Sequence, residues 1–309
     1  MPKCVSIISL LCLMFATNAF SAQEVSGNNS ERAGAIGWSA FARGGFMHQM
    51  DADIDGGGSF SVNRFSFHAG PTYSYAEGSS LSLAVGYGFD SYHFSGKTAF
   101  GSREPWHDVH SFRFSIPWRW KINDRWTGLM SPTLLYSATD GVDVNDAVTG
   151  GGLAAFSYRY SDRLSIGAGL AIMTQLEDNT QIIPIVTIQW KITDTLSLQS
   201  GRGTGATLGP GLSLKWRPSR NWSFSFGARY EKLRFRLHNK TVSNGIGEDR
   251  SFPIFAGIEY QCNPKTYISL IGGMTIGGEL SLADRKGWTI IEEEHDPAGF
   301  LGIAFSTRF

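Results

Sequence analysis

Basic side chains stand at alternate positions of one segment, a spacing that could line a passage with positive charge. Between residues 111 and 122 the odd positions include Arg113, Arg119 and Lys121, whereas every even position is apolar or aromatic. Successive side chains of a β-strand point to opposite faces, so this spacing gives a strand with one apolar face and one cationic face. Rings of cations favour the passage of anions. The chemistry that this pattern favours is electrostatic selection of a solute.

The same alternation recurs near 81–89, 208–216, 222–230 and 301–309. It assigns a set of charged residues to the polar face, which we expect to face a lumen. The expected lumen-lining residues are Arg64, Arg113, Arg119, Lys121, Arg159, Lys215, Arg217, Arg229, Glu231, Glu259 and Arg308, with Asp90 also opposing the cations. Two interpretations stay open: a pore with a weak preference for anions, or arginine–carboxylate pairs that brace or plug the lumen.

Composition also favours a membrane-spanning barrel. The chain has 37 Gly, 21 Phe, 10 Tyr and 9 Trp, but a hydrophobic fraction of only 42%. A barrel needs one face for lipid and one for a polar lumen, which fits these proportions. The net charge of zero gives no reason to expect a nucleic-acid partner. No cofactor is expected.

The first residues are typical of a secretory signal peptide. Lys3 precedes an apolar run from Val5 to Phe15, and small residues follow up to Ala22. The run is shorter than the roughly 20 residues that span a bilayer. We therefore expect a signal peptide over 1–22, cleaved after Ala19, Ser21 or Ala22, a short periplasmic segment over 23–35 and a barrel over 36–309. Removal of the signal peptide would leave Cys262 alone, so no disulfide framework is expected.

Counting alternating runs predicts an all-β fold, a single transmembrane antiparallel β-barrel of about fourteen strands. The predicted strands lie near 36–47, 61–75, 80–95, 107–121, 125–137, 150–160, 164–174, 181–191, 195–202, 206–217, 221–238, 251–261, 266–280 and 298–309. Short connections alternate with longer ones near 48–60, 96–106, 138–149, 239–250 and 281–297. Short periplasmic turns and longer extracellular loops are typical of outer-membrane barrels, so the bacterial outer membrane is the expected location.

Tryptophans gather beside the short connections. Because the indole ring is apolar and its N–H seeks water, Trp favours the membrane–water interface. The expected periplasmic aromatic girdle is Trp118, Trp120, Trp126, Trp190, Trp216 and Trp222. The alternative, a soluble sandwich with six core tryptophans, is disfavoured because the opposite faces of these strands carry Arg and Lys.

The alternation is irregular in two places. After Tyr230 the apolar positions change parity to Leu233, Phe235 and Leu237, which predicts a bulge or a strand emerging above the membrane. In the first strand, Trp38 and Phe41 have opposite parity, which leaves its faces ambiguous.

The sequence gives only weak indications of a catalytic or metal-binding site. His93 and His110 stand close in sequence to Ser91, Ser95 and Ser111, but nothing fixes a base and an orienting group beside a nucleophile. No metal site is expected either. The run from Asp51 to Gly56 begins like a calcium-binding loop, but its twelfth position is Val62, where a bidentate Glu should stand. The acids of the outer loops are more simply read as solvated surface charge.

Two parts of the sequence resemble features of known outer-membrane barrels. The last strand ends in Phe309 with Phe305 before it, which resembles the signal recognised by the outer-membrane barrel assembly machinery. The stretches 227–231, 234–237, 251–253 and 277–280 resemble a family of uncharacterised, porin-like outer-membrane barrels catalogued under a domain of unknown function. That resemblance implies fold and location and names no site.

From these observations the sequence predicts a passive, porin-like channel for small hydrophilic solutes, with outer-membrane lipid and the assembly machinery as partners. A closed barrel with a structural or surface-interaction role is the alternative. A barrel hydrolase is a more distant one.

Overall fold

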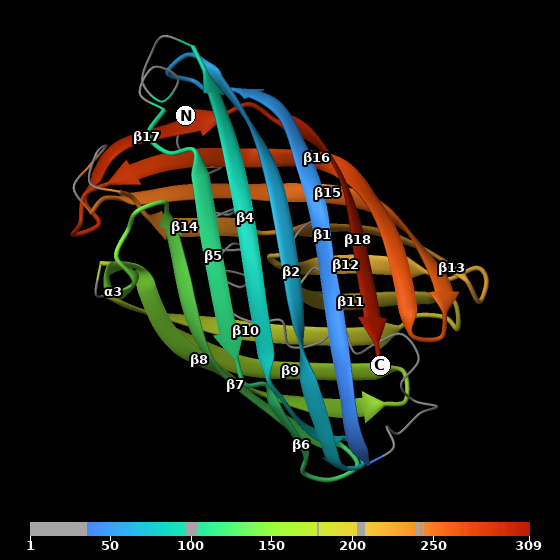
Figure 1. Cartoon of the computed structure of the whole chain (residues 1–309). Helices are drawn as coiled ribbons and strands as arrows, with labels where there is room; N and C mark the ends of the chain where they lie inside the picture. The colour runs from blue at the N-terminus through green and yellow to red at the C-terminus, as the bar shows by residue number, and fades with distance from the viewer. Residues whose placement is uncertain are drawn as a thin grey trace, which may run out of the picture.

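The protein folds into one closed antiparallel β-barrel, seen in a computed structural model that describes residues 36–96, 100, 104–177, 179–202, 208–238, 242 and 244–309 (Figure 1). The signal peptide and the periplasmic segment expected before residue 36 lie outside the described residues. A short helix, α3 (Val144–Ala147), precedes one strand. No helix of the described ranges is long and apolar enough to cross a membrane.

Eighteen strand segments make up the sheet. In chain order they are β1 Gly37–Asp53, β2 Ser59–Ala76, β3 Ser79–Ser82, β4 Ala84–Ser95, β5 Asp108–Ser115, β6 Trp118–Lys121, β7 Trp126–Thr139, β8 Val148–Ser161, β9 Leu164–Thr174, β10 Thr180–Lys191, β11 Leu196–Arg202, β12 Pro210–Trp216, β13 Trp222–Arg229, β14 Glu231–Arg236, β15 Ile246–Asn263, β16 Thr266–Ala283, β17 Thr289–His295 and β18 Ala298–Arg308. Four pairs of segments are single strands with an interruption, namely β3/β4, β5/β6, β13/β14 and β17/β18. The barrel therefore has 14 strands, and β1 closes it by pairing with both β2 and β18.

Proline explains why those strands are interrupted, because it cannot donate a hydrogen bond to a neighbouring strand. The N–H of Leu83, between β3 and β4, bonds to the carbonyl of Pro71, and the N–H of Ile116 bonds to that of Pro132. Tyr230, between β13 and β14, donates to the carbonyl of Pro210, and Pro297 separates β17 from β18. At the first interruption the backbones approach so closely that only glycine fits at position 70, where a Cβ would lie 1.7 Å from the oxygen of Leu83.

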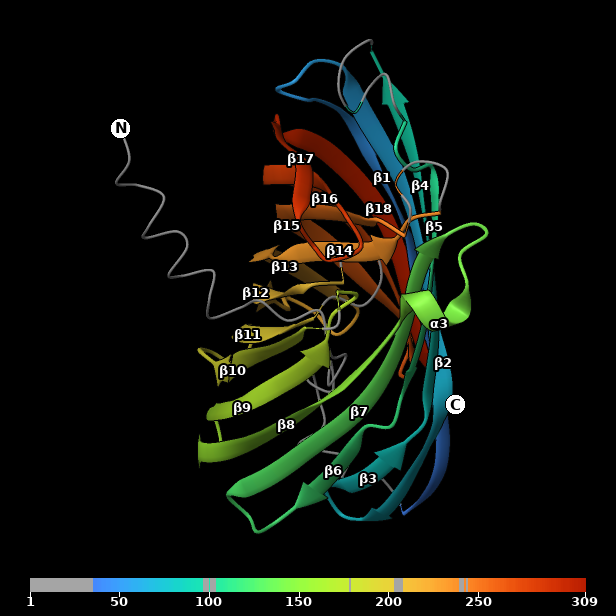
Figure 2. The ribbon, with the colours of Figure 1, turned by 90° about the vertical axis from the view of Figure 1, so that its left-hand side faces the viewer.

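The period-2 pattern sorts the side chains between lipid and lumen. On β9, Ile166, Leu170 and Ile172 are exposed on the outer surface, whereas Ala171 and Met173 are buried on the inner face. This separation repeats around the barrel, as expected for strands with lipid on one side. The strands of the near wall (β1, β2, β4, β5) cross those of the far wall (β10 to β12) steeply, and Figure 2 gives the view from the side.

The outer end of the barrel is pinched. Beyond Tyr230, β14 continues the strand of β13 but parts from β12; it stays paired with β15 and reaches β7, where Arg236 pairs in parallel with Ala138. The backbone N–H of His238 then donates to Oγ1 of Thr139 at 3.0 Å. Since β7 and β14 belong to strands far apart around the barrel, this contact joins opposite walls.

The structure confirms the predicted fold, including the fourteen strands and the interruption after Tyr230. It corrects the outer loops. The predicted connection 281–297 contains β17, and β1, β2 and β15 extend into the predicted connections 48–60 and 239–250. The extensions of β1 and β2 pair with each other, and those of β15 and β17 pair with β16. They lie above the apolar band, so an apolar lipid-facing side did not mark them.

Candidate functional site in the lumen

The inner face of the barrel carries most of the charged residues expected there. Inward positions are those opposite in parity to the lipid-exposed side chains of the same strand. They include Arg64 on β2, Arg113 on β5, Arg119 on β6, Arg159 on β8, Lys215 on β12, Arg229 on β13 and Glu259 on β15, and they add Arg43 on β1 and Asp249 on β15. The last two were missed from sequence, Arg43 because the first strand's parity was ambiguous and Asp249 because it lies in a predicted loop.

A buried ionic network crosses the outer part of the lumen. Arg64 bonds to Asp90 at 3.3 Å and to Asp249 at 2.6 Å. The hydroxyl of Tyr92 donates to the same oxygen of Asp249 at 2.8 Å. Asp249 is only 4% exposed, and its partners come from the other wall of the barrel. In the outer part of the lumen, arginine–carboxylate pairs therefore brace the barrel, which was the second of the two interpretations of the sequence.

An apolar plug fills the lumen beside and above that network. Its core is Phe60, Tyr92, Trp106 and Phe235, with the Trp106 ring 5.2 Å from that of Phe235 and 6.0 Å from that of Tyr92. The full set of buried residues in this outer plug is Ala52, Ile54, Phe60, Val62, Tyr92, Phe100, Trp106, Val109, Phe235, Leu237, Leu280, Leu282 and Ala298. Edge-to-face aromatic pairs of this kind stabilise a core beyond simple burial. Leu233, Phe235 and Leu237 reach it because β14 crosses the barrel.

The opposite face of β14 is held by loops. Arg234 bonds to Glu177 and Glu248 at 2.9 Å, and to the side chain of Gln175 at 2.8 Å. Arg236 donates to the backbone oxygens of Asp146, Leu176 and Asn244. The β9–β10 loop and α3 are thus fastened across the outer end.

Like charges meet lower in the lumen. Arg113 lies within electrostatic range of Arg43, and Arg119 lies within electrostatic range of Arg159, so each guanidinium is repelled by a second one. Charges of one sign at close range in a low-dielectric wall are costly unless water or a counter-ion screens them. This arrangement provides a cationic wall formed by β1, β5, β6 and β8.

Other predicted residues have defined contacts. Nζ of Lys215 lies 2.7 Å from Oε1 of Glu259. The guanidinium of Arg229 lies over the ring of Phe255 and donates to the carbonyls of Gly201 and Gly209. Glu231 accepts a bond from the N–H of Gly209 at 2.7 Å.

The remaining cations lie at the inner rim. Lys121 pairs with Asp124 in the next turn at 2.7 Å, and its hydrogen bond lowers the pKa of the Asp124 carboxyl. Arg217 directly follows β12, and Arg308 ends β18 opposite Phe41. The cations that we expected to cluster at the periplasmic end are thus distributed around the inner rim.

The lumen also has apolar walls, which the expectation of a polar interior did not include. One patch combines Leu153, Ala155, Ala171, Met173 and Ile183 on β8 to β10. A second joins Met47, Phe255 and Phe300. The sequence did not reveal these patches. Their strands also carry many apolar residues on the lipid side, so a few more apolar residues on the inner face do not change the composition noticeably.

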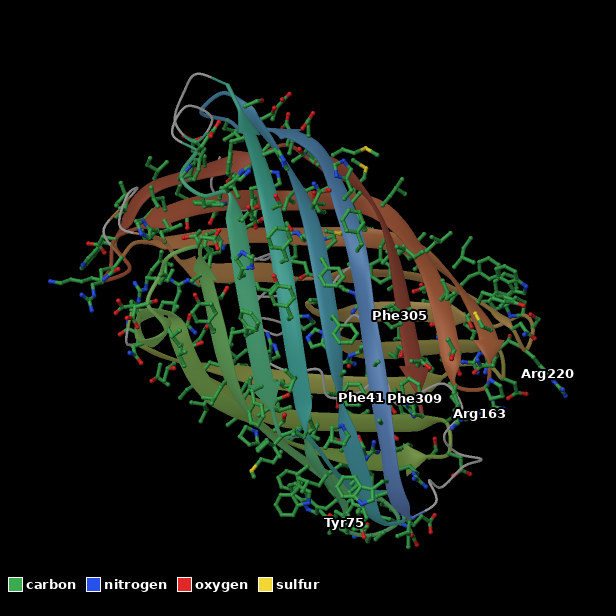
Figure 3. All side chains as sticks on the ribbon, viewed as in Figure 1. Phe41, Tyr75, Arg163, Arg220, Phe305 and Phe309 are labelled. Atoms are coloured by element: carbon green, nitrogen blue, oxygen red, sulfur yellow. The ribbon has the colours of Figure 1, made fainter. Side chains whose placement is uncertain are left out.

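The predicted girdle forms a band on the outer surface at the inner end. Trp118, Trp126, Trp190, Trp216 and Trp222 are each more than 40% exposed, and Trp120 packs on Trp118 with ring centroids 4.8 Å apart. Trp38 joins the band beside Tyr73. Figure 3 shows Tyr75, Arg163 and Arg220 at this rim, with Phe41, Phe305 and Phe309 nearer the middle of the view.

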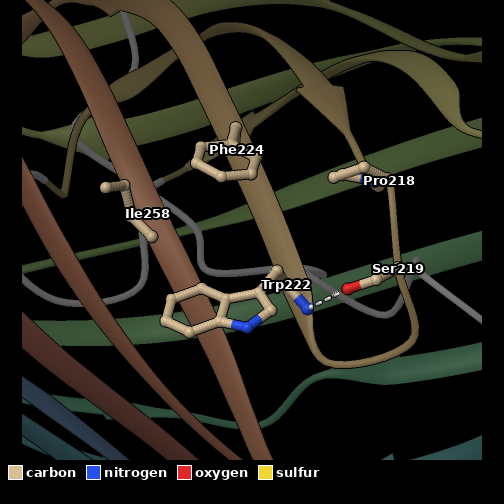
Figure 4. A pocket seen from close by; sticks show the side chains of 5 residues that line it. All are labelled: Pro218, Ser219, Trp222, Phe224 and Ile258. Carbon is tan, nitrogen blue, oxygen red and sulfur yellow. Dashed lines mark hydrogen bonds between the residues drawn. The ribbon is translucent and has the colours of Figure 1, made fainter.

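A shallow recess on the same rim has no charged lining. Pro218, Ser219, Trp222, Phe224 and Ile258 form it, and the N–H of Trp222 donates to Oγ of Ser219 at 3.2 Å (Figure 4). Since it faces the lipid side of β12, β13 and β15, we assign it no role in solute selection.

The described residues do not assemble the hydrolase arrangement considered from sequence. His110 contacts Asp140 at 3.2 Å and Tyr87 at 2.9 Å, and the ring of His93 packs edge-to-face against that of His107. Ser111 instead bonds to Ser137, and Ser95 to Ser59. Within the described ranges, no three His, Cys, Asp or Glu side chains gather in a way that could hold a metal ion.

A closed 14-stranded barrel with an aromatic girdle and a charged interior defines a porin-like barrel of the outer-membrane class. Residues 91–308 match the family described as "Domain of unknown function (DUF6268)", and the chain belongs to that family.

Solved outer-membrane barrels are similar in fold. An outer-membrane channel of Pseudomonas putida F1 is 11% identical over 92% of this chain and 100% of its own, with a TM-score of 0.47. A FadL homologue of Pseudomonas aeruginosa is 11% identical over 89% of this chain and 91% of its own, with the same TM-score. The toluene transporter TodX of P. putida is 9% identical over the same shares, at 0.45. No curated protein matches the sequence.

Proposed function

We propose that the protein is a passive channel of the bacterial outer membrane for small solutes, with a preference for anions. The observation that supports this most is the pairing of like charges in the lumen, Arg43 with Arg113 and Arg119 with Arg159. Such pairs are better tolerated in a hydrated passage than in a packed core. Inward cations also outnumber inward acids along the described strands. Small hydrophilic solutes remain the class proposed from sequence.

The outer plug qualifies this proposal. Its aromatic side chains are almost fully buried, so they occupy part of the direct route from the lumen to the medium. A channel of this form must move the plug to connect periplasm and medium. The plug and the Arg64 network are also what a closed barrel with a structural role would need, and they favour that role as the second candidate.

Ion selectivity tests the proposal. The double variant Phe60→Ala/Phe235→Ala, which shortens two plug side chains, is inserted in planar bilayers under a KCl gradient. We expect a reversal potential shifted toward the equilibrium potential of chloride. Adding Arg113→Gln and Arg119→Gln should reduce the chloride preference several-fold. Arg163→Gln, in an exposed turn, is the matched control and should leave it unchanged. Cation preference in the plug variant would contradict the proposal.

A further inference from the structure

One row of the inner wall carries three basic side chains within four neighbouring strands. Arg43 on β1 pairs with His68 on β2. The same row continues through Gly86 on β4 to Arg113 on β5. These positions point inward, because they are opposite in parity to the lipid-exposed side chains of their strands. We call Arg43, His68 and Arg113 the cationic row.

The side chains of the cationic row are held close together. Gly86 has no Cβ, and the imidazole of His68 lies across that position, so the ring extends from β2 toward β5. On β1, the guanidinium of Arg43 lies over the ring of Phe41, with its central carbon 5.7 Å from the ring centroid. Stacking on an aromatic ring orients the planar guanidinium. Arg43 and Arg113 consequently lie within electrostatic range of each other, although two strands separate them.

The row supplies positive charge without an acid of its own. Its described positions from β18 to β8 contain no acidic residue. The nearest inward carboxylate on β4 is Asp90, and Arg64 binds it at 3.3 Å. The three basic side chains are partly exposed. Two guanidinium groups at close range repel each other, and a bound group with two negative charges would offset both.

Short side chains flank the cationic row on both sides. The next inward row toward the outer end is Gly45, Ser66, Gly88, Ser111 and Ser137, and the row toward the inner end includes Ala84, Ser115, Thr133 and Gly151. Close packing does not require glycine at position 88, where a Cβ would meet the Cβ of Ser111 at an ordinary 3.5 Å. Short residues at these positions leave the ends of the longer basic side chains accessible from the lumen.

The flanking rows also offer hydroxyl groups. Oγ of Ser111 lies 2.9 Å from Oγ of Ser137, and either can donate. Thr133 is 4% exposed, and within the described ranges its Oγ1 has no hydrogen-bond partner. A buried polar atom is costly unless water or a solute supplies a partner. Hydroxyl groups beside cations suit a solute whose body is itself hydroxylated, because an apolar body would leave them unpaired.

We propose that the cationic row is a binding site for a small organic solute with a hydroxylated body and a dianionic group, either a phosphate monoester or a pair of carboxylates. The dianion bridges Arg43 and Arg113, with His68 between them, and the body lies against the short side chains of the next row toward the outer end. This rests on the proposed channel function and narrows its solutes from small anions to hydroxylated dianions.

Isothermal titration calorimetry of the unmodified, folded barrel in detergent tests the site without requiring an open channel. Glucose 6-phosphate and glucarate are the dianionic probes, glucuronate is a monoanion of similar size, and glucose is the neutral compound. The titrations are made at about pH 8, where a phosphate monoester carries nearly two negative charges. At least one dianion should bind several-fold more tightly than glucuronate, and glucose should not bind. Glucuronate that binds as tightly as both dianions would overturn the assignment.

Substitutions in the row test its place in the lumen. Arg43→Gln and Arg113→Gln should each weaken the binding of the tighter dianion several-fold. Lys215→Gln removes another inward cation, one that pairs with Glu259 outside the row, and serves as the matched control. It should leave the affinity nearly unchanged. Equal weakening by all three substitutions would show general attraction by the lumen and overturn a defined site.

Gly88→Gln separates recognition of the body from recognition of the charge. A Cβ fits at position 88, so the barrel should fold, and the longer side chain fills space beside the cationic row. The variant should bind glucose 6-phosphate or glucarate several-fold more weakly, whereas inorganic phosphate should bind as it does to the unmodified protein. Equal losses for the organic dianions and inorganic phosphate, or no loss for any of them, would overturn the placement of the body.

Failure of the site and failure of the channel are distinguishable. A folded barrel that conducts chloride after its plug is shortened but binds no dianion would lose the proposed site and keep the channel function. A barrel that binds the dianion but carries no current would keep the site and lose the channel function.

Discussion

At the residue scale, the feature with the largest expected energetic effect is the carboxylate of Asp249. It is the shared acceptor of Arg64 and Tyr92, contributed by strands on the other wall of the barrel. A buried ion pair adds little net stability compared with an apolar replacement, but removal of one partner leaves an uncompensated charge. The network is therefore sensitive to single substitutions.

Asp249→Ala should destabilise the folded barrel by about 3–5 kcal/mol, because it leaves the Arg64 charge without its closest acceptor. The measurement is the free energy of unfolding in urea, followed by the mobility shift between folded and unfolded forms on gels. Asp194→Ala, whose pair with Arg163 is 90% and 58% exposed, is the control and should cost at most about 1 kcal/mol. If both variants lose the same free energy of unfolding, the cross-lumen network stabilises the barrel no more than an exposed ion pair does.

At the element scale, β14 decides the shape of the outer end. It leaves the wall after Tyr230, brings Phe235 into the outer plug and presents Arg236 to three backbone oxygens of α3 and two loops. The change of parity after Tyr230 in the sequence indicates this change of direction. Which face Leu233 and Phe235 meet could not be predicted, because their partners on β2 and β4 are far away in the chain.

Arg236→Met should release the β9–β10 loop and α3, because the carbonyls of Asp146, Leu176 and Asn244 lose a charged donor. The expected result is faster cleavage of the outer loops by protease in intact cells, by several-fold, with the barrel itself still folded. Arg285→Met, at a side chain 67% exposed, should not change the cleavage rate. If protease cleaves the loops of the Arg236→Met variant no faster than those of the unmodified protein, this account is contradicted.

The last strand, β18, carries the expected assembly signal. Phe309 exchanges backbone hydrogen bonds with Ala40 at the closing seam, and its ring is exposed. Phe309→Ser should therefore lower the amount of folded barrel in the outer membrane several-fold, with unfolded protein accumulating in the periplasm. Phe305→Leu, which keeps an apolar side chain on the outer surface, serves as the milder comparison. Normal membrane levels of the Phe309 variant would exclude the signal.

Strand number, most strand positions and the tryptophan band were predictable because each depends on a local period of two or on the turns beside it. Contacts across the lumen were not predictable. Arg64 and Asp249 are 185 residues apart, and alternation gives the face of a residue but not its partner.

At the scale of the whole molecule, the barrel combines a lower lumen with a cationic wall and an outer end that holds a buried apolar cluster. In the channel that we propose, the cationic wall attracts anionic solutes and the outer plug limits their passage. The account therefore predicts a channel whose conductance is limited by aromatic packing at its outer mouth.

The most direct test of that claim is single-channel recording of the unmodified protein and of the Phe60→Ala/Phe235→Ala variant in the same planar bilayers. The account predicts rare, brief openings for the unmodified protein and long-lived openings for the variant, because the shortened side chains no longer fill the outer lumen. Phe305→Leu, on the lipid side, should behave like the unmodified protein. A folded variant as silent as the unmodified protein would contradict the account and favour a filled barrel with a structural role.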